Sequence, residues 1–245
     1  MSKKTVIVTG VSGGLGFAIA EAYLKRGYNV VGSDITTERL KDAAARLGNP
    51  SNFLTVAGDI AKKATATELF ARAIEAFGKV DVLVNNAGIF IPKQITEYTE
   101  DDLNLIVGTN LMGFFYPSQL AAAHMSGRKQ GHIINITASI AMQPNAKVPA
   151  LLPVLIKGGL NQATRALALE LAPANVKVNA VAPGIIETPL HADYEGVRDF
   201  YNTLAPTGTT GVTKDVVDAV MYLSDSSFTT GIVLPVDGGA TTGVF

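Results

Sequence analysis

The stretch TVIVTGVSGGLG, residues 5–16, decides the fold of this chain. Its first five residues are all β-branched, which is typical of a buried strand. The glycines that follow let the backbone turn sharply, and the residues after them, through Tyr23, have the spacing of a helix. A strand, a glycine-rich turn and a helix in this order bring backbone N–H groups to a point where they can meet a pyrophosphate. The stretch therefore predicts a dinucleotide site rather than a simple tight turn.

Short β-branched runs alternate with helical segments along the rest of the chain. The predicted strands are TVIVT (5–9), NVVGS (29–33), FLTVAG (53–58), VLVNN (82–86), HIINIT (132–137), VKVNAVA (176–182) and IVLPV (232–236). Between them, apolar residues such as Leu69, Phe70 and Ala73 share one helical face. Strands and helices that alternate in this way form a parallel sheet with helices on both faces. We therefore predict an α/β protein, a single-domain Rossmann fold whose parallel sheet has seven strands.

The composition is that of one domain, residues 1–245, without an obvious charged partner. Hydrophobic residues make up 47% of the chain and charged residues 17%, as expected for a sheet covered on both faces. The 20 Lys and Arg residues nearly balance the 21 Asp and Glu residues, which argues against nucleic acid or an anionic membrane as a partner. The chain has no cysteine and only three scattered histidines, so we predict no disulfide and no metal site. The first apolar run is too short for a signal peptide, and a cytoplasmic location is the expectation.

Asp34 follows the second predicted strand and bears on the choice of cofactor. A carboxylate at this point accepts hydrogen bonds from the ribose hydroxyls of NAD and repels the 2′-phosphate of NADP. Neither Gly13 nor Ile35 supplies a basic residue that would attract that phosphate. The sequence thus favours NAD, and the alternative for Asp34 is the N-cap of the next helix.

Several further motifs stand at matching positions along almost the whole chain. They are TGVSGGLG (9–16), Asp34, Asp59 in GDI, NNAG (85–88), Asn110, Lys157 and PGIIETP (183–189). With these residues the chain resembles the short-chain dehydrogenase/reductase family. The resemblance implies an NAD-dependent oxidoreductase that acts on a small alcohol or carbonyl compound, with a substrate lid near residues 188–210. It also implies a homotetramer or homodimer, with the helix over residues 160–172 as a candidate contact face.

The resemblance also assigns roles to individual residues. The implied catalytic residues are Asn110, Ser139 and Lys157, where Asn110 would hold a water of a proton relay and Thr137 is the alternative to Ser139. The implied cofactor-binding residues are Gly10, Ser12, Gly14, Leu15, Gly16, Asp34, Asp59, Ile60, Asn86, Ala87, Gly88, Lys157, Pro183, Gly184, Ile186 and Thr188.

The chain departs from the family pattern at Pro153. In the family a tyrosine four residues before the active-site lysine donates the proton, but Pro153 stands at this position before Lys157 and has no proton to give. No tyrosine occurs between Tyr116 and Tyr194, so a small shift in alignment does not supply one. Proline is tolerated in the first turn of a helix, and we therefore expect this helix to begin near Leu151 or Leu152.

Two sets of residues could replace the missing tyrosine. Lys157 is the first, because burial lowers the pKa of a lysine toward neutrality. His191, Tyr194 and Tyr201 of the expected lid are the second.

Three functions follow as alternatives. The favoured one is an NAD-dependent oxidoreductase with an altered proton relay, and the second is an NAD-binding protein without turnover. The third is a different reaction that uses bound NAD. A polar pocket with His191 or a lid tyrosine would favour catalysis. A pocket filled by Leu151, Leu152 or Val154 would favour the binding protein.

Overall fold

The computed structural model describes residues 3–188 and 197–243, and it confirms the predicted fold class. A seven-stranded parallel sheet has the order β3-β2-β1-β4-β5-β6-β9. Its strands are β1 (Thr5–Thr9), β2 (Asn29–Asp34), β3 (Phe53–Ala57), β4 (Val82–Asn85), β5 (Gly131–Ile136), β6 (Val176–Pro183) and β9 (Val233–Val236). The order reverses direction between β1 and β4, and this is where open α/β sheets bind ligands, beyond the carboxyl ends of the strands.

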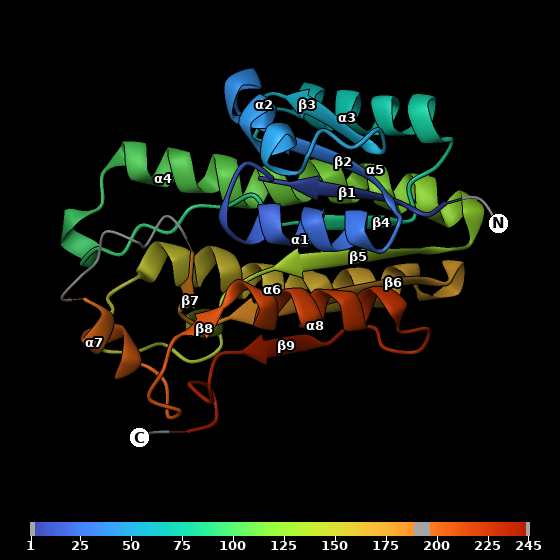
Figure 1. Ribbon diagram of the computed structural model, residues 1–245. Coiled ribbons are helices and arrows are strands. Elements are labelled where there is room, and N and C mark those ends of the chain that lie inside the picture. The colour runs from blue at the N-terminus through green and yellow to red at the C-terminus, as the bar shows by residue number, and fades with distance from the viewer. Residues whose placement is uncertain (1–2, 189–196, 244–245) are drawn as a thin grey trace.

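Helices cover both faces of the sheet (Figure 1). On one face lie α1 (Gly14–Lys25), α2 (Thr37–Arg46) and α8 (Thr213–Asp225), which contribute buried residues to a core with β1, β2 and β4. On the other face lie α3 (Lys63–Phe77), α5 (Gly113–Arg128) and α6 (Leu151–Leu171). All five residues of β1 are buried, because a parallel strand inside such a sandwich is covered on both sides.

The carboxyl ends of the strands lie at one edge of the molecule, on the left in Figure 1. Thr9 pairs with Ser33, Asn85 with Asn135 and Asn135 with Ala180, so these strands end close to one another. At this edge lie α7 (Arg198–Asn202) and a small two-stranded sheet of β7 (Ile186–Glu187) and β8 (Gly211–Val212). The sequence did not predict β7 and β8, since strands of two residues carry no readable period.

The strand ends differ from the prediction by one residue in most cases. β4 ends at Asn85, not at residue 86, because the side chain of Asn86 turns to bond the backbone of β1. β3 ends at Ala57, where Gly58 takes a positive φ of 158°.

Pro153 lies in the first turn of α6, which begins at Leu151 as expected. The N-cap residue is Ala150, whose carbonyl accepts the backbone N–H of Val154 at 2.9 Å. The missing N–H of Pro153 therefore removes no hydrogen bond inside the helix.

The segment after NNAG is helical but not uniform. A short helix, α4 (Glu100–Ile106), runs through a π-helical segment, Val107–Met112, into α5. Asn110 is buried inside the π-helical segment. The remaining short turns are the 3₁₀ segments Ile95–Glu97, Ser139–Ala141 and Ala172–Ala174. Within the described residues, no helix has the length and apolar character needed to cross a bilayer.

Candidate active site

A cleft of about 2180 Å³ opens at the carboxyl ends of the strands. Its wall includes the glycine loop after β1, the end of β2, the NNAG loop, the end of β5 and the segment after β6. The predicted site residues in its wall are Gly10, Ser12, Gly14, Leu15, Gly16, Asp34, Asp59, Ile60, Asn86, Ala87, Gly88, Ser139, Lys157, Pro183, Gly184, Ile186 and Thr188. The fold thus brings together segments far apart in the chain. Asn110 is the exception, since it does not line the cleft.

The glycine loop leaves a cradle that no side chain could share. A Cβ on Gly16 would lie 1.9 Å from the carbonyl oxygen of Gly10 and 2.5 Å from Nδ2 of Asn86, so only glycine fits there. Gly10 and Gly14 have positive φ angles of 73° and 52°. The N-cap of α1, Gly13, makes no side-chain capping bond, which leaves the first N–H groups of the helix open to the cleft. A glycine-rich loop in front of an uncapped helix fits the pyrophosphate of a dinucleotide.

Thr188 lies beside this cradle, although it is distant in sequence. A Cβ on Gly14 would lie 3.6 Å from Cγ2 of Thr188. The segment after β6 therefore reaches back over the glycine loop.

Asp34 is held at the end of β2 by the glycine loop itself. Its Oδ2 accepts hydrogen bonds from the backbone N–H of Ser12 at 3.2 Å and from Oγ of Ser12 at 2.6 Å. Its Oδ1 accepts the N–H of Ile35 at 2.8 Å. Asp34 is not the N-cap of α2, since Thr36 fills that position and accepts the N–H of Arg39. The carboxylate instead faces the cleft wall.

A basic residue stands next to Asp34, and the sequence analysis missed it. Nη1 of Arg39 lies 3.8 Å from Oδ1 of Asp34, and Arg39 lines the cleft. The sequence search considered only the residue directly after the strand. Because α2 begins at Thr37, its first turn brings Arg39 back to the strand end. The helix start at Thr36 was the signal that could have found it.

The NNAG loop is tied to β1 by backbone and side-chain hydrogen bonds. Oγ1 of Thr9 accepts the N–H groups of Asn86 and Ala87 at 3.0 and 2.9 Å. Nδ2 of Asn86 donates to the carbonyl oxygens of Thr9 and Gly10. These hydrogen bonds therefore hold the glycine loop and the NNAG loop together.

A buried polar chain connects the strands to the helices behind the cleft. Nδ2 of Asn85 donates to Oγ of Ser118 and to Oδ1 of Asn135, both at 2.9 Å. Nδ2 of Asn135 donates to Oγ1 of Thr164 at 2.9 Å. Four elements, β4, α5, β5 and α6, share this chain. It fixes α6, and with it Lys157, against the sheet. Individual asparagines in strands gave no sign of such a chain in the sequence.

Asn110 holds the backbone just beyond NNAG. Its Oδ1 accepts the N–H of Ile89 at 2.8 Å, and its Nδ2 donates to the carbonyl of Ile89 at 2.9 Å. Asn110 thus supports the cleft wall from behind, and its expected role, to hold a water of a proton relay, stays a prediction. The backbone around Asn110 is π-helical and so departs from the regular α-helical hydrogen-bonding pattern. Such π-helical turns are frequent at functional sites.

Lys157 projects from α6 into the back of the cleft. Its side chain is buried, and Nζ donates to the carbonyl oxygen of Ile136 at 2.7 Å. Burial lowers the pKa of Lys157 to about 8, because desolvation penalises the ammonium. A Cβ on Gly88 would lie 3.3 Å from Nζ of Lys157 and 3.2 Å from Oδ1 of Asn110. Gly88 therefore lets the lysine and the asparagine approach each other.

The two candidates for the serine role differ in their surroundings. Oγ1 of Thr137 donates to the carbonyl of Val181 at 3.3 Å, while the N–H of Thr137 bonds the same oxygen. Ser139 begins a 3₁₀ turn just beyond β5, and both Thr137 and Ser139 are nearly buried in the cleft wall. Because the hydroxyl of Thr137 already bonds Val181, Ser139 is the better placed of the two to meet a ligand.

Pro153 does not line the cleft, and neither do Leu151, Leu152 and Val154. The apolar plug considered from the sequence is thus not formed by these residues. Tyr201, on α7, does line the cleft. His191 and Tyr194 lie outside the described residues.

The far end of the cleft is built from three segments. They are the loop after β5, the region around α7 and the turn after β9. Nε2 of Gln143 donates to the carbonyl of Gly243 at 2.9 Å, which links the first and last of these segments. The carboxylate of Asp237 accepts the N–H groups of Gly239 and Thr241, both at 3.0 Å.

Comparisons with known proteins agree with this geometry. A family model described as enoyl-(acyl carrier protein) reductase matches residues 10–241. Subunit BbsD of (2S)-[(R)-hydroxy(phenyl)methyl]succinyl-CoA dehydrogenase from Thauera aromatica is 32% identical over 243 residues, which cover 98% of this chain and 97% of that protein.

Two solved structures are similar over nearly the whole chain. The structure of ElxO with NADP bound has a TM-score of 0.92 at 30% identity and covers 98% of this chain and 100% of its own. The 3-ketoacyl-(acyl-carrier-protein) reductase from Brucella melitensis, in complex with NADH, has a TM-score of 0.90 at 30% identity and covers 98% of this chain and 99% of its own. The chain therefore belongs to the short-chain dehydrogenase/reductase family of oxidoreductases.

Proposed function

We propose that this protein is an NAD(H)-dependent oxidoreductase that interconverts a small alcohol and its carbonyl compound, without a tyrosine at position 153. The observation that carries the proposal is the approach of buried Lys157 to Gly88 and Asn110 in the wall of the cleft that contains the glycine cradle. A bound nicotinamide would supply or accept the hydride. The chain would supply the positions of the reactants and the proton.

Individual roles follow from the contacts. Ser139 would hydrogen-bond the substrate oxygen, because its residue lines the cleft beyond β5. Asn110 would fix the backbone at Ile89, through its paired hydrogen bonds. The region of residues 188–210 would act as the lid, and Phe200 and Tyr201 are two of its described members in the cleft wall.

NAD is the proposed cofactor rather than NADP. The support for NAD is the carboxylate of Asp34, oriented by Ser12, since it would accept from ribose hydroxyls and repel a 2′-phosphate. Arg39 acts in the opposite direction, because its guanidinium stands 3.8 Å from that carboxylate. The similar structures include one with NADP and one with NADH.

The remaining parts of the proposal concern the state of the protein. We propose a single functional domain over residues 1–245, a small-molecule substrate as its partner, and a cytoplasmic location. We also propose a homodimer or homotetramer. Its support is the exposed apolar side chains on helices of one sheet face, namely Phe115 (50% exposed), Leu155 (62%) and Leu169 (80%).

One observation favours a second candidate, a dinucleotide-binding protein without turnover. Pro153 stands where relatives would need a proton donor, while the cradle and the Asp34 end of the cleft are complete. Such a protein would bind NADH and catalyse nothing.

The experiment compares the wild type with Pro153→Tyr over a panel of alcohols, aldehydes and ketones, and measures NADH binding by both through fluorescence titration. Turnover by the wild type, followed as NADH absorbance, supports the oxidoreductase. Turnover by Pro153→Tyr alone supports the binding protein. NADH binding with no turnover by either variant also contradicts the oxidoreductase, and absent NADH binding contradicts both candidates.

A further inference from the structure

We propose that Nζ of Lys157 is itself the group that gives the proton to, and takes it from, the substrate oxygen. This inference rests on the proposed oxidoreductase function and names its proton donor. In the family pattern the lysine assists a neighbouring tyrosine, whereas Lys157 would exchange the proton with the substrate oxygen directly.

The ammonium of Lys157 has N–H groups available to a ligand. Among the described residues, none of the ion pairs includes Lys157, and burial is the cause that lowers its pKa. Its hydrogen bond to the carbonyl of Ile136 uses one of the three N–H groups. Two N–H groups are left for a ligand or water.

The position of Lys157 in the cleft wall also supports this role. Lys157 lies on the cleft wall together with Gly88 and Ser139. A Cβ on Gly88 would lie 3.3 Å from Nζ of Lys157 and 3.2 Å from Oδ1 of Asn110, which places the amine against the NNAG loop, with the Asn110 carboxamide near the same glycine. The buried chain from Asn85 through Asn135 to Thr164 fixes α6 on the sheet, so the amine is held rather than free to move.

The other described residues at this end of the cleft are poorer proton donors than Lys157. Pro153 has no proton and lies outside the wall. Thr137 gives its hydroxyl hydrogen to Val181. Asp237 accepts two backbone N–H groups as a carboxylate. Tyr201 is the one phenol among the described residues that line the cleft, and the test below separates it from Lys157.

The acidity of the lysine suits the task. Burial lowers the pKa of Lys157 to about 8, so the ammonium carries its proton at pH 7 and has lost most of it at pH 9. A general acid and base works best when its pKa lies near the working pH. An ordinary lysine, with a pKa near 10.4, would hold its proton too firmly.

The proposed hydride and proton transfers balance in atoms and electrons. In carbonyl reduction, the substrate carbon accepts a hydride from reduced nicotinamide dinucleotide, and a C–H bond forms as the C=O π bond breaks. The substrate oxygen takes a proton from Nζ of Lys157, which becomes a neutral amine. The dinucleotide is oxidised by two electrons, and Lys157 regains its proton from solvent. Alcohol oxidation is the reverse, with the neutral amine as base.

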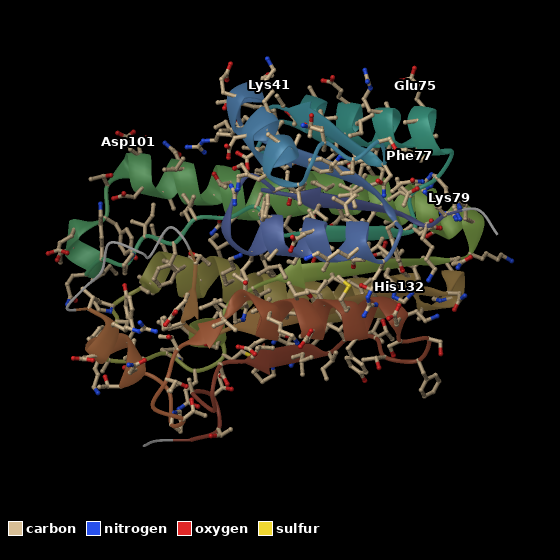
Figure 2. The ribbon with its side chains drawn as sticks, viewed as in Figure 1. Lys41, Glu75, Phe77, Lys79, Asp101 and His132 are labelled. Carbon is tan, nitrogen blue, oxygen red and sulfur yellow. The ribbon has the colours of Figure 1, made fainter. Side chains whose placement is uncertain are left out.

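The test uses Lys157→Arg, Lys157→Met and Tyr201→Phe, with Lys41→Met as the control. Lys41 is exposed on α2, away from the cleft wall (Figure 2). We expect both Lys157 variants to lose at least about 100-fold in kcat, the usual range for removal of a general acid. Tyr201→Phe changes a side chain in the cleft wall, and we expect its kcat to keep the same pH dependence as the wild type. Lys41→Met is expected to leave kcat unchanged.

The pH profile and NMR provide readouts that a purely structural lysine would not give. We expect kcat for reduction to fall above a pKa of about 8, and kcat for oxidation to rise through the same value. In protein with ¹⁵N-labelled lysine, the Nζ resonance that disappears in Lys157→Arg should titrate near the same pH, without substrate or cofactor.

Each outcome decides. Loss of turnover in both Lys157 variants together with a titration near pH 8 supports the proposal. In an active wild type, a Lys157 pKa near 10.4, turnover retained by Lys157→Met, or a pH dependence near pH 8 that is lost in Tyr201→Phe overturns it and leaves the oxidoreductase function standing. A wild type that binds NADH but turns over no substrate overturns the function and this inference together.

Discussion

Among the glycines of the described residues, Gly16 has the least room for a side chain. A Cβ at this position would meet the Gly10 carbonyl at 1.9 Å, and the contacting atom is backbone, so the glycine loop would have to shift. We expect Gly16→Ala to raise the Kd for NADH at least about tenfold, which corresponds to ~1.4 kcal/mol. Gly159→Ala in α6 is the control, because a Cβ there meets nothing within 4 Å. Fluorescence titration measures both, and unchanged binding by Gly16→Ala would contradict the cradle.

Asp34 and Arg39 together set the balance between NAD and NADP in our proposal. Asp34→Asn removes the charge that repels a 2′-phosphate and leaves Arg39 unopposed. Because hydrogen bonds to charged groups contribute about 1.5–3 kcal/mol, we expect the ratio of Kd values, NADPH over NADH, to fall by at least about tenfold.

The matched variant is Arg39→Gln, which removes the guanidinium and keeps a neutral side chain of similar length. It should leave NADH binding within about threefold of the wild type. Tighter binding of NADPH than of NADH by the wild type would show that Arg39 outweighs Asp34.

The contacts of some single residues could not be predicted from the sequence. Asp34 at the strand end and the glycines of the loop were predicted from local rules. Arg39 was missed because its effect depends on the first turn of α2 folding back on the strand. The hydrogen bonds of the Asn110 carboxamide to Ile89 were not predicted, and its expected role of holding a relay water stays a prediction.

At the scale of elements, α5 and β5 each carry a histidine whose protonation opposes folding. Nε2 of His124 accepts the backbone N–H of Val80 at 3.0 Å, which requires a neutral ring. His132, labelled in Figure 2 at the end of the sheet away from α7, has a buried Nδ1 without a partner among the described residues. Burial is the largest cause that lowers the pKa of both histidines.

The sign of the pH effect follows from these lowered pKa values. The unfolded chain takes up protons near the ordinary histidine pKa of about 6.5, before the folded protein does. Stability is therefore fully present above that pH and falls as the pH drops through 6.5 toward the folded-state values. Urea unfolding at pH 8, 6.5 and 5.5 should show this loss, and the double variant His124→Gln with His132→Gln should show a smaller slope. An equal slope in both proteins would contradict the assignment.

The elements themselves were largely predictable. All seven strands of the main sheet and the start of α6 at Leu151 follow from β-branched runs and from the place of Pro153. The π-helical segment around Asn110 and the pair β7 and β8 were not predictable, because they depend on contacts between distant segments.

For the whole molecule, exposed apolar side chains on α5 and α6 support self-association. Phe115 and Leu169 are 50% and 80% exposed on helices that cover the same face of the sheet. We expect the wild type, with a chain of 25.6 kDa, to sediment as a dimer or tetramer and Leu169→Glu to shift it to a smaller species. Burial of a charge without a partner is the cause.

Lys41→Gln is the control for this experiment, because it lowers the net charge by one unit, as Leu169→Glu does, but on α2, on the opposite sheet face. Analytical ultracentrifugation compares the three proteins. A wild type that sediments as a monomer would contradict the proposed assembly.

The sequence by itself determined the order of strands and helices, the turn that begins at Gly10 and the absence of a phenol four residues before Lys157. These depend on the β-branched and helical periods, on positive φ angles and on residue identity, which are local properties of the chain.

Only the tertiary structure decided which side chains meet at the carboxyl edge of the sheet. It set Lys157 beside Gly88 and the Ile136 carbonyl, placed Arg39 next to Asp34 and kept Pro153 out of the cleft wall. The reason is physical: burial and hydrogen bonding between segments far apart in the chain set the pKa of Lys157 and the lining of the cleft. No local pattern carries that information.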